Sequence, residues 1–199
     1  MSDTTAASSA PSAQEERRFI LGGLNVEQLR SLSGQRCHTV LDGRYVTILE
    51  HRGRIYALDS PCYHAAGPLG EGPVVDIEDI PCIRCPWHQF LVALDTGEEI
   101  TRKAKPPNFT DDANQVFQPP TYPMQPPSED SFVGPAVRGG KAVQRIHRTE
   151  LEEGTGDIIV YLQGVDVIKH RPVRSDVNAC HQRGAMSMQI RDIKQRGLE

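Results

Sequence analysis

Residues 37–64 read CHTVLDGRYVTILEHRGRIYALDSPCYH. The stretch holds three short runs rich in Val, Ile, Tyr and Thr, separated by Asp-Gly at 42–43 and by Arg-Gly at 52–53. These residue types favour strands, and Asp-Gly between two such runs is a strong signal for a tight hairpin. The stretch therefore predicts a three-stranded antiparallel meander that leads directly into a Cys/His pair, Cys62 and His64.

Similar short segments continue on both sides of the meander. Residues 25–32 predict a short helix capped by Asn25. Further strands are predicted at residues 72–85, 142–151 and 156–165, together with a hairpin over 89–100 that turns at Asp95-Thr96-Gly97. Short strands separated by glycine turns are typical of a barrel or sandwich. The predicted fold class is all-β, an antiparallel sandwich or barrel.

The composition divides the chain into one domain and its appendages. Residues 1–17 lack an apolar signal core and predict a disordered tail. Residues 18–165 form the domain, interrupted by a Pro-rich insertion at about 105–135, which predicts an extended loop because proline removes hydrogen-bond donors from a sheet. Residues 166–199 are polar and predict an extension that the core does not need, with a weak helix over 186–197.

Length and charge exclude several classes of function. The 199 residues carry a net charge of −4, which gives no signature of nucleic-acid binding. No apolar run approaches the roughly 18 residues of a membrane span. Five cysteines are an odd number for a disulfide framework and favour a reducing compartment. We therefore expect a cytoplasmic monomer with neither a nucleic-acid partner nor a membrane span.

A second Cys/His pair, Cys85 and His88, lies about twenty residues after the first. Four thiol and imidazole ligands in two loops indicate a metal site. A structural zinc finger usually takes two cysteines from one knuckle and two histidines from a helix, whereas here each loop offers one of each. This order suits a two-iron cluster in which the cysteines hold one iron and the histidines the other. Structural zinc stays open as an alternative.

The other cysteines and histidines fit structural roles better. Cys82 forms C-x-x-C with Cys85, a spacing found in thiol-redox pairs, but its apolar strand predicts a buried structural thiol. Cys37 is expected on a strand, and Cys180 is expected to be exposed. The sole tryptophan, Trp87, is expected in the core or as a cover for the metal. The remaining histidines are predicted to be surface residues or satisfied core residues: His38, His51, His147, His170 and His181.

Three motifs together resemble those of one family. CYHAAGPL at 62–69, CPWH at 85–88 and TGE at 96–98 resemble the Rieske domain, and within it the soluble Rieske-type ferredoxins. The resemblance extends over roughly residues 19–163. It implies a Rieske-type β-sandwich with a small cluster-binding subdomain and one [2Fe–2S] cluster per chain. Cys62 and Cys85 would ligate one iron, and His64 and His88 the other.

The resemblance implies an electron-transfer protein and not an enzyme. After Gly97 the chain offers only His147, His170 and His181, in a segment too short for the second domain of a Rieske oxygenase and without a paired-histidine motif next to an acid. There is also no G-x-G-x-x-G dinucleotide fingerprint, so electrons would come from another protein, a flavoprotein reductase, and go to an oxygenase-like acceptor. Two alternatives remain: a Rieske-like small subunit or regulatory domain of a larger oxidoreductase, and a zinc-binding adaptor.

The same resemblance bears on the reduction potential. High-potential respiratory members carry an extra cysteine on each ligand loop and hydroxyl donors after the second histidine. Here Gly67 and Trp87 hold the cysteine places, and Phe90 and Val92 hold the hydroxyl places. Rieske centres span about −150 to +300 mV, and hydrogen bonds to the sulfurs raise the value. We therefore expect a potential near the low end, on the order of −150 mV.

Overall fold

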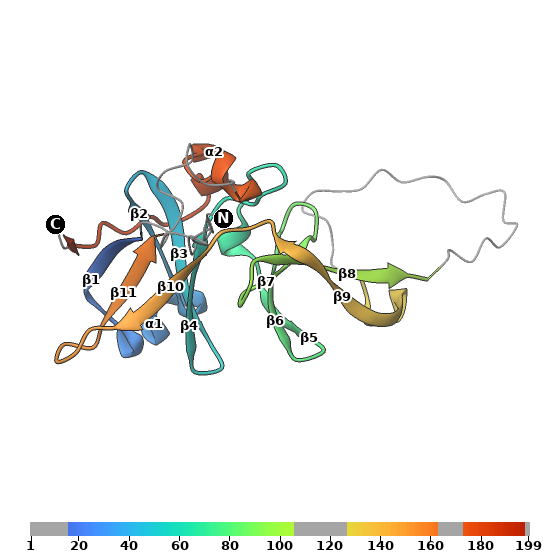
Figure 1. Ribbon diagram of the computed structural model, residues 1–199, viewed down its shortest axis with the longest axis horizontal. Helices are drawn as coiled ribbons and strands as arrows, with labels where there is room; N and C mark the ends of the chain where they lie inside the picture. Colours follow the sequence, from blue (N-terminus) through green and yellow to red (C-terminus); the bar gives the residue numbers. More distant parts are fainter. Residues whose placement is uncertain (1–15, 106–126, 163–172, 198–199) are drawn as a thin grey trace, which may run out of the picture.

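The structure, a computed structural model, describes residues 16–105, 127–162 and 173–197. Two antiparallel sheets lie side by side (Figure 1). One sheet has, in spatial order, β12 (Gln195–Gly197), β1 (Arg17–Asn25), β11 (Asp157–Leu162), β10 (Ile146–Leu151), β4 (Arg54–Asp59), β3 (Arg44–His51) and β2 (Arg36–Leu41). The other has β5 (Val74–Ile77), β6 (Ile80–Arg84), β7 (Leu91–Ala93), β8 (Glu98–Ala104) and β9 (Phe132–Ala142). The all-β prediction is confirmed.

The predicted meander forms β2, β3 and β4. Its two turns are two-residue hairpins, with Leu41 paired to Arg44 and His51 paired to Arg54. All four turn residues have positive φ, 48° and 76° at 42–43 and 50° and 78° at 52–53. This is the geometry that a right-twisted hairpin requires, and glycine adopts it without steric cost.

The short helices cap and connect the strands. The predicted helix is α1 (Val26–Ser31), where the Asn25 side chain accepts a hydrogen bond from the Gln28 N–H at 2.9 Å and the Gln28 side chain bonds back to Asn25. This reciprocal capping box satisfies N–H groups that the first turn leaves without partners. The remaining helices are α2 (Gln182–Ala185) and the 3₁₀ turns η1 (Ser33–Gln35), η2 (Leu69–Glu71), η3 (Glu129–Ser131) and η4 (Arg174–Val177).

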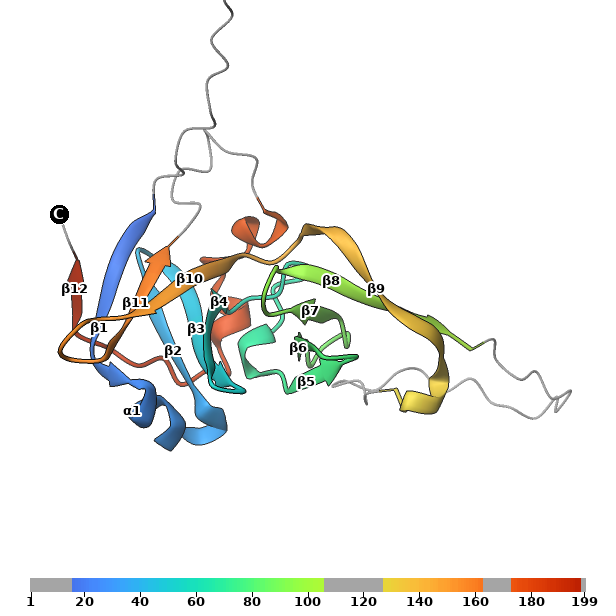
Figure 2. The same cartoon turned by 60° about the horizontal axis from the view of Figure 1, so that its bottom comes forward.

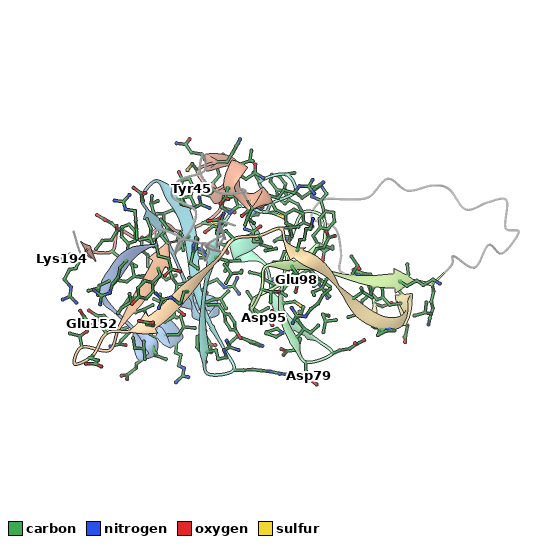
Figure 3. All side chains as sticks on the ribbon, in the orientation of Figure 1. Tyr45, Asp79, Asp95, Glu98, Glu152 and Lys194 are labelled. Carbon is green, nitrogen blue, oxygen red and sulfur yellow. The ribbon has the colours of Figure 1, made fainter. Side chains whose placement is uncertain are left out.

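One strand begins where a loop was predicted. The expected loop at 105–135 includes the start of β9, while residues 106–126 lie outside the described residues. Pro135 fits because β9 is the edge strand of its sheet, where a missing N–H is tolerated. Arg138 on β9 binds Asp95 at 2.9 Å and Glu98 at 3.0 Å, in the β7–β8 turn labelled in Figure 3. The proline and glycines of this stretch therefore gave no local signal for β9, a strand that is held partly by the ion pairs of Arg138.

The C-terminal extension differs most from expectation. Ser175 and Ala179 are fully buried, and β12 pairs with β1 at the sheet edge, as Figure 2 shows. The helix predicted over 186–197 is wrong, because this stretch contains β12 and a bridge from Ile190 to His38. At the other end, residues 1–15 lie outside the described residues and β1 begins at Arg17.

Three apolar clusters make up the core, the smallest of them within the five-stranded sheet around Ile77, Cys82 and Ile100. Of the other two, the first lies inside the seven-stranded sheet around Leu21, Ile48 and Leu162. The second joins the two sheets and includes Leu58, Leu69, Ile83, Val92, Cys62 and Cys85. Both predicted cysteine ligands are therefore part of the packing between the sheets. Among the described residues, no helix has both the length and the apolar character needed to cross a membrane.

Candidate metal centre

The two Cys/His motifs lie on adjacent loops. The first ligand loop, residues 60–70, follows β4 and is closed at its base by a bridge between Pro61 and Pro68. The second ligand loop, residues 85–90, joins β6 to β7 and is closed by the Cys85 N–H, which donates to the Phe90 carbonyl at 2.8 Å. Each loop is closed at its base by backbone pairing, so the backbone positions the donors in advance.

The structure brings all four predicted ligands together in two pairs. The thiols of Cys62 and Cys85 are joined by a hydrogen bond, and the two residues are 1% and 0% exposed. The Nδ1 atoms of His64 and His88 lie 3.3 Å apart, with the rings perpendicular. His64 is exposed and His88 is half-buried. The sulfurs therefore face the core and the imidazoles face the surface.

Backbone N–H groups point at both sulfurs. The N–H groups of His64 and Ala65 bond to the Cys62 sulfur, and those of Trp87 and His88 bond to the Cys85 sulfur. The hydrogen bond between the thiols, followed by burial, raises the pKa of Cys62. The same bond lowers the pKa of Cys85 to about 7. Donors aimed at sulfur stabilise a thiolate, the form of cysteine that binds metals.

The imidazole pair has the spacing of two ligands on one metal ion. Two nitrogens at roughly 2.0–2.1 Å from a tetrahedral ion such as zinc lie about 3.3–3.4 Å apart, and the two Nδ1 atoms are 3.3 Å apart. Burial, followed by the charge of His64, lowers the pKa of His88. A lowered pKa favours the neutral ring, whose lone pair is free to ligate.

The donors fit a two-iron group better than a single ion. A cluster with two bridging sulfides asks for two protein ligands on each iron, with thiolates on one and imidazoles on the other. The observed sulfur pair and nitrogen pair meet that requirement, whereas a four-ligand zinc site needs all donors around one point.

Aromatic side chains lie around the site. The Trp87 ring lies against Gly67, so the second loop packs onto the first. The Phe90 ring centroid is 4.8 Å from that of His64 and 5.8 Å from that of Tyr63. Trp87 also packs against the cluster of core residues between the sheets. Trp87 is thus a partly buried residue at the edge of the core, and its role as a cover for the metal stays a prediction.

Among the described residues, the remaining cysteines and histidines take the structural positions predicted for them. Burial raises the pKa of Cys82 to about 12 and that of Cys37 to about 11, and Cys180 is exposed. All five cysteines lie in the described ranges, and none forms a disulfide. His170 lies outside the described residues. The other histidines are hydrogen-bonded or exposed: His38 to Thr47, His51 to Asp76, His147 to Asp59, and His181 at the surface.

Sequence reasoning missed the residues that hold the first ligand loop from outside. Gln144 and Asn178 bond to its backbone, and Asp59, just before the loop, is the centre of a buried charge network. Gln144 lies 81 residues from its partner Tyr63, and Asn178 lies 116 residues from Cys62. Neither residue belongs to a local motif, so only the fold reveals these contacts.

A curated protein is similar in sequence to part of this chain. The chain is 40% identical over 72 residues to a human Rieske domain-containing protein, which is 36% of this chain and 46% of that relative's length. The match thus spans about half of the curated relative.

Two solved structures are similar in outline. One is a protein from Mycobacterium tuberculosis assigned as an NADH-dependent nitrite reductase small subunit, with TM-score 0.45, 15% identity, and coverage of 77% of this chain and 99% of that one. The other is the ferredoxin of carbazole 1,9a-dioxygenase from Nocardioides aromaticivorans IC177, with TM-score 0.39, 18% identity, and coverage of 71% and 94%.

The family of soluble Rieske-type ferredoxins matches residues 24–115. This region contains the meander, both ligand loops and the β7–β8 turn. The ligand motifs therefore lie inside the matched region, and the family implies a [2Fe–2S] cluster. Over residues 24–115 the chain is similar to the soluble Rieske-type ferredoxins.

Proposed function

We propose that Cys62 and Cys85 ligate one iron, and His64 and His88 the other, of a single [2Fe–2S] cluster, and that the chain is a one-electron carrier. The observation that carries the proposal is the convergence of two loops into a buried sulfur pair and a surface imidazole pair. When bound, such a cluster accepts and releases one electron at a time. The protein itself supplies position, hydrogen bonds and exclusion of water.

The exposure pattern supports an electron route through the histidines. The thiols are sealed in the core between the sheets, whereas the imidazoles reach the surface. Beside His88 lies a cavity of about 240 Å³ whose lining includes the apolar side chains of Phe90, Leu91 and Phe132. A partner protein that docks there would come close to the imidazole edge. The docking face is thus the side of the molecule that carries both histidines.

The partners follow from what the sequence lacks. Without a dinucleotide fingerprint, the chain depends on a reductase, for which a flavoprotein is the best candidate. Without a second iron motif, the chain passes its electron on to an acceptor of the oxygenase class. We place this carrier in the cytoplasm, with its odd number of cysteines as support, and expect it to be a monomer.

Anaerobic coulometric titration tests the proposal. The purified protein should take up one electron per chain, with bleaching of its visible colour complete at that point. Cys62→Ser should lose this uptake because a hydroxyl is a poor replacement for a thiolate. The matched control is Cys82→Ala, since Cys82 is also a buried thiol but lies on β6 away from the donor set. A colourless chain that takes up no electron would contradict the proposed function.

A further inference from the structure

The two ligand loops are supported in different ways. The second loop is held by hydrogen bonds between its own residues. In one of them, the Gln89 N–H donates to the Cys85 carbonyl at 2.9 Å. The first loop is also held by a side chain from the C-terminal extension. Asn178 Nδ2 donates to the Cys62 carbonyl at 2.9 Å and to the Tyr63 carbonyl at 3.2 Å. Those two carbonyls belong to the peptide units that connect Cys62 to His64.

A second amide holds the same peptide units from another part of the chain. Gln144 Oε1 accepts the Tyr63 N–H at 2.9 Å, and its Nε2 donates to the carbonyls of Asp59 at 2.7 Å and Pro61 at 3.0 Å. Gln144 is fully buried. Between them, Asn178 and Gln144 bond to both backbone polar groups of Tyr63, the residue that separates the cysteine from the histidine.

Buried polar groups fix the segment that carries Asn178. Ser175 Oγ donates to Asp59 at 2.9 Å and accepts the Arg145 N–H at 2.8 Å. Asp176 accepts from Arg44 at 2.6 Å and from Arg145, and its side chain is 1% exposed. Charged hydrogen bonds of this kind, shielded from water, hold a segment in one arrangement.

The segment is also fixed on its other side. The Tyr45 N–H donates to the Ala179 carbonyl at 2.9 Å, and Tyr45 lies beside the C-terminal extension in Figure 3. Ala179 itself is fully buried. Asn178 is therefore held between anchored neighbours, which keep its side-chain amide against the ligand loop.

We propose that Asn178 is a positioning residue for the first pair of ligands and that residues 173–179 form a brace for the first ligand loop. This inference rests on the proposed function. Fixing the carbonyls of Cys62 and Tyr63 fixes the directions in which the Cys62 and His64 side chains leave the backbone. The C-terminal extension is thus a working part of the metal centre, although it lies beyond residues 24–115 that match the family.

Substitutions of Asn178 distinguish a positioning role of the brace from a general effect on the stability of the fold. Asn178→Ala removes both hydrogen bonds, and Asn178→Asp keeps the shape but replaces the donor with an acceptor. The controls are Val177→Ala, next to it and 81% exposed, and Ile20→Val, which weakens the β1 core elsewhere. Hydrogen exchange of the loop peptide 60–67 and the electron paramagnetic resonance spectrum of the reduced holoprotein are recorded for each.

In both Asn178 variants, the amide hydrogens of the loop should exchange with solvent about tenfold faster, because opening the loop no longer breaks these two hydrogen bonds. The resonance lines of both variants should broaden or shift, while both controls keep the wild-type spectrum. If the Asn178 variants show the exchange rates and the spectrum of the wild type, the proposed brace is wrong, whereas the proposed function is unaffected. A chain without iron would overturn the function, and the exchange measurement would still test whether Asn178 holds the loop.

Discussion

The indole ring of Trp87 lies so close to Gly67 that a Cβ atom on residue 67 would come within 2.9 Å of Trp87 Cδ2. Gly67 belongs to the first ligand loop and Trp87 to the second. Their contact is where the two loops close over the donors. Here glycine is required for space and not for backbone conformation, because Gly67 is not among the residues with positive φ.

Gly67→Ala should therefore force the loops apart. Overpacking of this kind costs about 1–3 kcal/mol, and the bound iron should leave faster in the presence of a chelator. Thermal unfolding and iron release are the measurements. Combining Gly67→Ala with Trp87→Leu should recover much of the loss, because the smaller side chain makes room. Equal iron release in the wild type and in Gly67→Ala would show that the loops do not depend on this contact.

Asp176→Asn should destabilise the fold strongly. Its carboxylate binds the buried guanidinium groups of Arg44 and Arg145. Removing one partner of a buried ion pair costs about 3–5 kcal/mol, because the remaining charge stays in a poorly solvated place. Urea denaturation measures the change. Asp192→Asn, an exposed site on the same extension, should stay within about 0.5 kcal/mol of the wild type. Equal unfolding midpoints for both variants would contradict the network.

His38 should make the fold sensitive to mild acid. Burial, followed by the charge of Arg36, lowers its pKa from 6.5 to about 4, although Glu71 at 3.2 Å opposes the shift. Between these two pH values the unfolded chain takes up a proton that the folded chain excludes. The free energy of unfolding should therefore fall as the pH drops from 6.5 to 4.

Urea midpoints measured across that window test this prediction. His38→Gln should flatten the slope, because glutamine does not titrate. The control is the same substitution at a more exposed histidine, His51→Gln, whose ring is bound to Asp76. A wild-type midpoint that does not change between pH 6.5 and 4 would show that His38 takes up its proton in the folded state as readily as in the unfolded chain.

The reduction potential should lie near the low end of the Rieske range, on the order of −150 mV. The places of the additional cysteines are filled by Gly67 and Trp87, which are in contact, so no disulfide joins the loops. Phe90 and the buried Val92 offer no hydroxyl to the sulfurs. Protein-film voltammetry at neutral pH is the measurement. A midpoint above about +100 mV would point to hydrogen-bond donors that this account omits.

Local patterns predicted much of this protein. The Asp42-Gly43 and Arg52-Gly53 turns specified the meander because two-residue hairpins depend on the conformations of their own residues. Asn25 specified the start of α1 for the same reason. The four donors could be proposed because each pair sits in a short motif. The contact between Gly67 and Trp87 was not predicted, because aligning both loops with a known family gave only the positions of the two residues.

Long-range contacts account for what the sequence did not reveal. β9 is held by pairing with β8 and by the ion pairs of Arg138. Its glycines and proline predict a loop because the local pattern contains neither of these contacts. The C-terminal extension is polar, but its Ser175 and Asp176 meet buried partners from β3, β4 and the segment before β10. A polar residue looks like a surface residue until the fold supplies its partners.

Electron paramagnetic resonance of the dithionite-reduced protein, with iron, sulfide and zinc measured on the same sample, tests the central claim most directly. The account predicts two irons and two sulfides per chain and a rhombic signal whose average g lies below that of an all-cysteine cluster. The signal should be lost in Cys62→Ser and Cys85→Ser and kept in Cys82→Ala. Stoichiometric zinc without iron after anaerobic purification, or loss of the signal in Cys82→Ala, would contradict it.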